Sequence, residues 1–117
     1  MDINALKEQA GRASRLLKSI ANDKRLLILC YLSESERSVG ELEQLVDLSQ
    51  SALSQHLARL RRDDLVQTRR EAQTIYYSVA SQEANAVLRT LHDLYCADGE
   101  AAVTAPAEAD LQTASGA

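Results

Sequence analysis

Apolar residues recur at three- and four-residue steps over most of the chain, and this spacing predicts helices. The first apolar stripe predicts a helix over residues 3–20. A second apolar segment predicts a helix over residues 24–34, and Asp23 is expected to cap it. The helical period returns late in the chain and predicts a last helix over residues 81–96.

Two shorter helices separated by a tight turn are predicted in the middle of the chain. Residues 38–41 (SVGE) form a capping box that opens a helix ending near Val46. Residues 47–49 form the turn, and Ser49 is expected to cap a second helix that ends near Arg62. A short helix, a turn and a second helix together indicate a helix-turn-helix.

The second of these helices has an apolar and a polar face. Its apolar face is predicted to consist of the leucines Leu53, Leu57 and Leu60. Its outward face carries small or polar side chains, namely Gln50, Ser51, Ser54, Gln55 and Arg59. Gln and Ser suit base edges in a major groove, and Arg suits guanine edges and phosphates. The same pattern also fits an ordinary amphipathic helix with a solvated side.

After this helix the pattern alternates with a period of two. Residues 65–70 and 74–79 are rich in Val, Thr, Ile and Tyr, and residues 71–73 separate them. This pattern predicts a β-hairpin, with Arg69 and Arg70 near its tip. The predicted fold class is therefore mainly α with a small β-hairpin.

Charge is distributed unevenly along the 117 residues, which carry a net charge of −4. Residues 97–117 hold four acidic and no basic side chains, and their small polar composition predicts a disordered acidic tail after a single domain over residues 1–96. Residues 49–70 hold five arginines against Asp63 and Asp64. This basic stretch is a candidate phosphate-binding surface, and it is equally compatible with a solvated face.

The sequence also excludes several classes of protein. No apolar run approaches the roughly 20 residues of a membrane span, and no secretory signal is visible at the N-terminus, so a cytoplasmic location with reduced thiols is expected. There is no Gly-rich phosphate loop, nucleophile elbow or Cys-x-x-Cys pair. We therefore expect neither an enzyme nor a cofactor. A dimeric interaction module that does not bind DNA remains the alternative to a DNA-binding protein.

Four segments carry a further signal: residues 25–29 (RLLIL), 40–42 (GEL), 48–57 (LSQSALSQHL) and 69–77 (RREAQTIYY). Together they resemble the ArsR/SmtB family of repressors, over roughly residues 5–96. The resemblance implies a winged helix-turn-helix, a homodimer through the first and last helices, and binding to inverted-repeat operator DNA. The chain departs from the family at Asp64 and Ala72, where many members carry Gly, and these departures bear on turn geometry.

The resemblance also adds His56 to the candidate DNA-binding residues, since family members carry a histidine there. Packing or a phosphate contact is its expected role. The full predicted set is Gln50, Ser51, Ser54, Gln55, His56, Arg59, Arg69 and Arg70.

The two cysteines, Cys30 and Cys96, are the candidate sensing residues. Taken singly, each fits a small core residue. A cysteine on the second helix together with one at the end of the last helix resembles the persulfide-sensing branch of the family, the BigR- and SqrR-like repressors. In that branch, reactive sulfur species join the two thiols through a disulfide or polysulfide bridge, which moves the recognition helices and releases DNA. The resemblance implies the same role for this pair.

A metal-responsive repressor is the other open alternative. Metal-sensing members carry a Cys-x-Cys type site in the helix after residue 38, or a carboxylate and His set on the last helix. Here residues 39–43 (VGELE) contain no sulfur, and the last helix has one histidine, His92. Divalent metals need three or four converging ligands, so no metal site is predicted, although Cys30, Cys96 and His92 could supply three.

Overall fold

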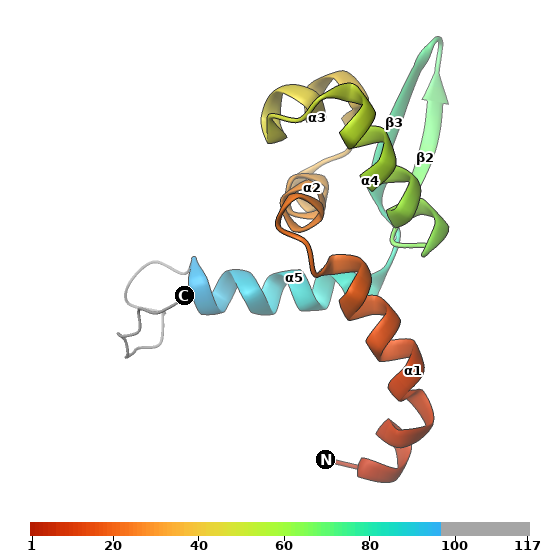
Figure 1. Ribbon diagram of the computed structural model, residues 1–117, viewed down its shortest axis with the longest axis vertical. Coiled ribbons are helices and arrows are strands. Elements are labelled where there is room, and N and C mark those ends of the chain that lie inside the picture. The colour runs from red at the N-terminus through yellow and green to blue at the C-terminus, as the bar shows by residue number, and fades with distance from the viewer. Residues whose placement is uncertain (97–117) are drawn as a thin grey trace. The chain divides into compact units, whose positions relative to one another are not determined.

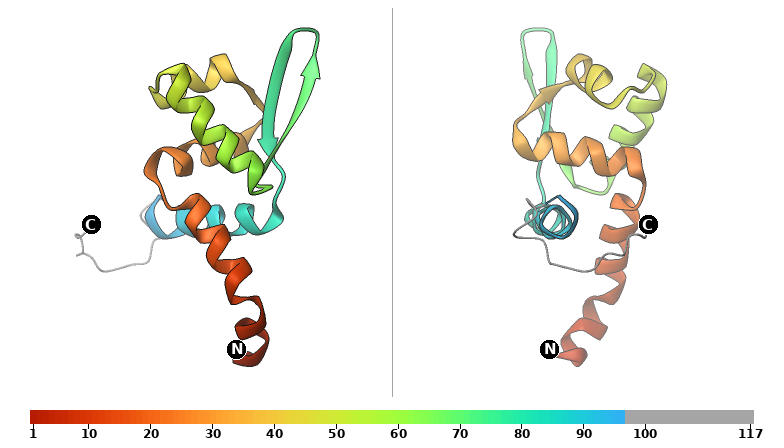
Figure 2. Two further views of the ribbon diagram at one scale, coloured as in Figure 1. Left: turned by 45° about the vertical axis from the view of Figure 1, so that its right-hand side comes forward. Right: turned by 90° about the vertical axis from the view of Figure 1, so that its left-hand side faces the viewer.

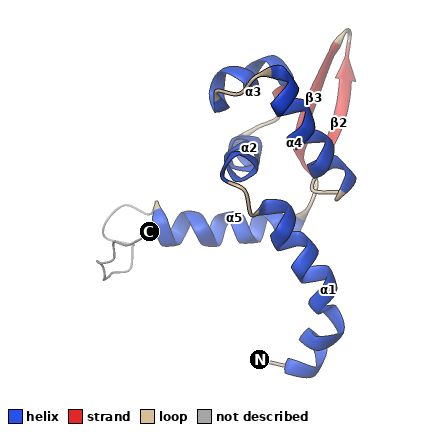
Figure 3. Cartoon of the chain, viewed as in Figure 1, coloured by secondary structure: helices blue, strands red, loops and turns tan. Residues whose placement is uncertain are grey.

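The computed structural model describes residues 1–96 and contains five helices and three short strands in that range (Figure 1). The helices are α1 (Ile3–Ile20), α2 (Asp23–Glu34), α3 (Val39–Val46), α4 (Gln50–Arg62) and α5 (Gln82–Tyr95). The strands are β1 (Arg37–Ser38), β2 (Val66–Glu71) and β3 (Thr74–Val79) (Figure 3). The predicted mainly helical fold with a β-hairpin wing is confirmed, whereas the predicted tail, residues 97–117, lies outside the described residues.

Polar side chains set the starts of the helices. The Ser38 hydroxyl accepts from the Glu41 backbone N–H while the Glu41 carboxylate accepts from that of Ser38, so the predicted capping box is confirmed. The prediction that Asp23 caps α2 is wrong. The Asn22 side chain accepts from the backbone N–H groups of Lys24 and Arg25 at 3.0 and 3.1 Å, which makes Asp23 the first residue of the helix.

The hairpin belongs to a three-stranded antiparallel sheet with the order β1-β3-β2. In the hairpin Val66 lies opposite Val79, and Glu71 lies opposite Thr74. The sequence pattern did not predict β1, because a two-residue strand shows no period of its own. Its pairing of Arg37 with Tyr77 joins the segment before α3 to the wing.

The contacts divide the chain into two compact units, the first of residues 1–85 and the second beginning at Ala86. In the first unit α2, α3 and α4 contact one another, and the hairpin extends beside α4 (Figure 2). The core of this unit is aliphatic and includes Ile28, Leu29, Leu42, Leu53, Leu57 and Leu60. None of the helices within residues 1–96 is long and apolar enough to cross a membrane.

Three residues other than glycine adopt left-handed backbone conformations, with φ of 55° at Asp47, 62° at Asp64 and 57° at Ala72. The last two are the positions at which the family resemblance led us to expect glycine. An L-residue in this region costs about 1–2 kcal/mol, and Asp tolerates it better than Ala does. Ala72 therefore holds the more strained of the two turns.

We expect Ala72→Gly to raise the free energy of unfolding by about 0.5–1 kcal/mol, because relief of the left-handed strain exceeds the entropy cost of glycine. Urea unfolding measures the change. Ala58→Gly, in an exposed position within α4, is the matched control and should lower stability by about 1 kcal/mol. A loss of stability in both variants would contradict the strain at Ala72.

Candidate nucleic-acid interface

The turn between α3 and α4 sets how α4 is presented. The left-handed Asp47 ends α3, and the Ser49 hydroxyl accepts from the Ala52 backbone N–H at 3.1 Å to start α4. Ser49 is thus the cap that the sequence predicts. The turn of the helix-turn-helix is therefore defined on both sides by local features, the left-handed backbone at Asp47 and the side-chain cap at Ser49.

The two faces of α4 follow the predicted pattern. Leu53, Leu57 and Leu60 are buried, with exposed fractions of 0–2%. The four short polar residues of the outward face are exposed: Gln50, Ser51, Ser54 and Gln55. These side chains carry donors and acceptors on a surface that lacks bulk, which is what entry into a major groove requires.

His56 faces inward, toward a buried arginine that the sequence did not single out. Arg25 on α2 places Nη1 3.4 Å from Nδ1 of His56. It also donates from Nε to the carbonyl of Ser19 at 2.6 Å and from Nη2 to that of Lys18 at 3.4 Å. Arg25 thereby joins the end of α1 to α4. We name this arrangement the Arg25 clasp.

The clasp makes protonation of His56 unfavourable. Burial, and then the charge of Arg25, lower the pKa of His56, while Asp23 acts in the opposite direction. Burial also lowers the pKa of Arg25, with a further contribution from Arg59, although an arginine stays charged at any physiological pH. His56 is consequently a neutral acceptor for the Arg25 guanidinium.

The predicted arginines differ in how far carboxylates already compensate them. Arg59 has its Nε 3.6 Å from Asp63. Arg69 contacts Glu36 through Nε and Nη2 at 2.6–2.9 Å and Glu71 through Nη1 at 2.8 Å. Its guanidinium also lies 4.7 Å from the centroid of the Tyr76 ring. The hydrogen bonds from Arg69 lower the pKa of Glu36, so that carboxylate stays ionised.

Arg70 differs from its neighbour on the wing. It is exposed, and within residues 1–96 no ion pair of its guanidinium is found. Of the two predicted wing arginines, Arg70 is therefore the one whose charge is uncompensated.

The two cysteines belong to different units. Cys30 is half-buried in α2, and its carbonyl accepts from the Ser33 hydroxyl at 2.7 Å. Cys96 is exposed directly after α5, and its backbone N–H donates to the His92 carbonyl at 2.7 Å. Residues 1–96 contain no group of three or more His, Cys, Asp or Glu side chains arranged to hold a metal ion.

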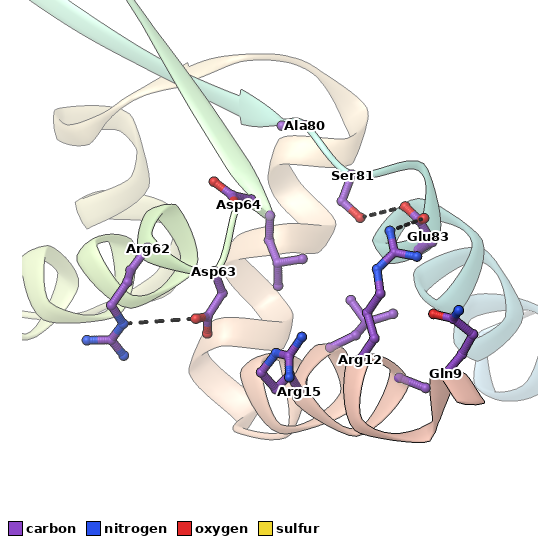
Figure 4. A pocket seen from close by; sticks show the side chains of 12 residues that line it. Gln9, Arg12, Arg15, Arg62, Asp63, Asp64, Ala80, Ser81 and Glu83 are labelled. Carbon is purple, nitrogen blue, oxygen red and sulfur yellow. Dashed lines mark hydrogen bonds and ion pairs between the residues drawn. The ribbon is translucent and has the colours of Figure 1, made fainter. Parts of the chain in front are cut away.

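A hollow of about 570 Å³ lies between α1, the α4–β2 turn and the start of α5 (Figure 4). Its charges are largely matched: Arg12 lies 3.5 Å from Glu83, and Arg62 lies 3.9 Å from Asp63. Figure 4 shows Arg62 directed away from Arg12 and Glu83. This mixed-charge hollow gives no preference for an anionic or a cationic ligand.

The lowered pKa of His56 predicts the pH dependence of stability. Below pH about 6.5 the unfolded chain binds a proton at this residue that the folded chain takes up only at lower pH. The free energy of unfolding should therefore fall as pH drops from about 7.5 to about 5.5. In His56→Gln the free energy of unfolding should fall less steeply over the same range. Urea unfolding at each pH tests this, with His92→Gln as the control. Equal slopes in all three proteins would contradict the clasp.

Comparison with known proteins places these features in a family. The profile of the bacterial regulatory protein arsR family matches residues 22–68. The chain is 53% identical to the transcriptional activator HlyU of Vibrio cholerae over 96 residues, which cover 82% of this chain and 89% of that protein.

Two solved structures share the fold. Reduced HlyU from Vibrio cholerae matches with a TM-score of 0.75 and 54% identity, over 79% of this chain and 97% of that one. The transcriptional repressor BigR from Xylella fastidiosa matches with a TM-score of 0.79 and 36% identity, over 84% of this chain and all of that one. The chain belongs to the ArsR family of winged helix-turn-helix, DNA-binding transcriptional regulators, with HlyU and BigR among its relatives, and it is not an enzyme.

Proposed function

We propose that this chain is a dithiol-responsive repressor that binds operator DNA when Cys30 and Cys96 are reduced. Reactive sulfur species join the two thiols, and the bridged protein releases DNA. The observation that carries this proposal is the pair of thiols on α2 and after α5, one half-buried and one exposed, in a relative of BigR and HlyU. One solved structure of the relative HlyU is that of the reduced protein, which supports a role for the redox state in that relative.

Exposure suggests the order of the two chemical steps. The exposed Cys96 thiolate attacks the outer sulfur of a persulfide RSSH, which forms a Cys96 persulfide and releases RS⁻. The Cys30 thiolate then attacks the Cys96 Sγ, which forms the disulfide and releases HS⁻. The net reaction oxidises two thiols and reduces one persulfide to RSH and H₂S. A second RSSH that adds one more sulfur before closure gives a trisulfide and a second RSH.

The DNA-binding part of the proposal rests on the surface of α4 and the wing. Gln50, Ser51, Ser54 and Gln55 read base edges, and Arg59, Arg69 and Arg70 act near the backbone. His56 has the packing role, because it faces Arg25 inside the fold. A phosphate contact by Arg59 or Arg69 has to compete with the carboxylates that these arginines already contact. Arg70 meets no such competition within the described part of the chain.

The proposed assembly is a homodimer on an inverted repeat. In α1, Ile3, Leu6 and Leu17 are 47–57% exposed, which leaves an apolar stripe for a second copy to cover. In α5, Leu94 and Tyr95 are 58% and 81% exposed. These surfaces support pairing through the first and last helices, with one recognition helix per half-site. A cytoplasmic location is part of the same proposal.

Gln55→Ala should lose sequence preference but keep general DNA binding. Removal of a base-edge contact costs about 1–3 kcal/mol against the selected sequence and little against a scrambled one. Duplexes selected from a random pool by the wild-type protein, compared with scrambled duplexes by fluorescence anisotropy, measure both affinities. A parallel loss on both duplexes would contradict a base-reading role for Gln55.

Cys30→Ser and Cys96→Ser should each bind the selected duplex when reduced and keep it after treatment with glutathione persulfide. The wild-type protein should release it, and intact mass should show a bridge between the two cysteines. Zinc and oxidised glutathione are parallel treatments. Release from both variants would rule out the thiol switch, and release by zinc alone would indicate metal sensing.

A further inference from the structure

A hollow of about 390 Å³ separates the recognition helix from the wing. Its walls come from one side of α4, from the start of α3 and from β3. The lining residues are Val39, Ser54, Leu57, Ala58, Arg61, Arg62 and Tyr77. Ser54 also belongs to the exposed polar face of α4, so the hollow adjoins the surface proposed to read bases.

Positive charge in this hollow is less compensated than at two of the predicted sites, Arg59 and Arg69. Arg61 is exposed, and no ion pair of its guanidinium is found within residues 1–96. Arg62 is 72% exposed and has only a 3.9 Å contact with Asp63. Arg59 lies closer to Asp63, and its Nε is buried without a hydrogen-bond partner. The folded helix therefore presents Arg61 and Arg62, and not Arg59, as its available cations.

The alternation of side chains along the hairpin separates the two wing arginines. Tyr77 lines the hollow and lies opposite Thr68 in the register. Successive side chains point to opposite faces of a sheet, so Arg70, two residues after Thr68, shares this face. Arg69 lies opposite Tyr76 on the other face, where it contacts Glu36 and Glu71.

We propose that this hollow binds a phosphate of the DNA backbone, with Arg61 as its principal cation. Arg62 adds charge, and the Tyr77 hydroxyl donates to a phosphate oxygen. Arg70 continues the same positive surface along the wing. The inference rests on the proposed DNA binding and deepens it, because it selects Arg61 and Arg62 from the predicted basic stretch and adds Tyr77, which the sequence pattern did not indicate.

The test compares Arg61→Ala with wild-type protein on selected and scrambled duplexes over a series of salt concentrations. Loss of a phosphate contact should weaken binding to both duplexes about tenfold. It should also reduce the slope of log K against log salt by about 1 for each protomer. Arg61→Lys keeps the charge and should keep most of the slope. Lys7→Ala, which removes one charge from exposed α1, is the matched control and should behave as wild type.

Duplexes that carry one neutral methylphosphonate at a time locate the contact. A methylphosphonate at the phosphate held in the hollow should weaken DNA binding by the wild-type protein about tenfold. It should leave DNA binding by Arg61→Ala unchanged. An unchanged salt slope in Arg61→Ala, with steep salt dependence in wild type, would refute phosphate binding in the hollow but leave the proposed function intact. A reduced slope in Arg69→Ala alone would place the phosphate at the other face of the wing, and it would likewise refute phosphate binding in the hollow. Failure of the wild-type protein to bind either duplex would refute both proposals.

Discussion

Burial of Leu53, Leu57 and Leu60 determines the rotation of α4 about its own axis, and the arrangement of the interface depends on that rotation. Each fully buried leucine contributes about 1.5–3 kcal/mol, so turning the helix to expose them would cost a large part of a small domain's stability. Because the three leucines point inward, the four short polar residues of the opposite face point outward. The Arg61 side is set by the same rotation, and it faces the wing.

Folding also divides the arginines by role. Arg25 lies in the interior, where its guanidinium binds the carbonyls of Ser19 and Lys18 at the end of α1. A buried cation needs such partners, because an unpaired one would be too costly to desolvate. Arg69 holds the wing to the segment before α3 through Glu36. The arginines left without close compensation are those that can bind an external anion, and so, under the proposed function, the internal ion pairs determine which arginines contact DNA.

Local signals in the sequence predicted most of the fold. The capping box at Ser38, the cap at Ser49 and the apolar faces of the helices each depend on residues within one or two turns, so they are legible in the sequence. The strand β1 and the Arg25 clasp depend on partners brought together by folding: Tyr77 lies some 40 residues from Arg37, and His56 some 30 from Arg25.

The candidate site was less predictable for the same reason. The sequence indicates a basic stretch over residues 49–70, but it does not say which of its arginines a carboxylate compensates. Arg59 and Arg61 look alike in the pattern and differ in the fold, since Asp63 lies one helical turn after Arg59. Asp23 and Asn22 are similarly ambiguous, because both residue types are good caps and only the backbone decides between them.

Helix α2 connects the proposed sensing chemistry to the recognition helix within the first unit. Cys30 and Arg25 lie on this one rigid element, and Arg25 contacts His56 on α4. A bridge that displaces α2 therefore acts on α4 through a packed helix–helix contact and a charged hydrogen bond.

A tenfold loss of DNA affinity requires a coupling free energy of only about 1.4 kcal/mol. Coupling of this kind is reciprocal, so DNA that favours the reduced arrangement must disfavour bridge formation by the same factor. Under the proposed function, the operator-bound protein is therefore harder to oxidise at equilibrium than the free protein.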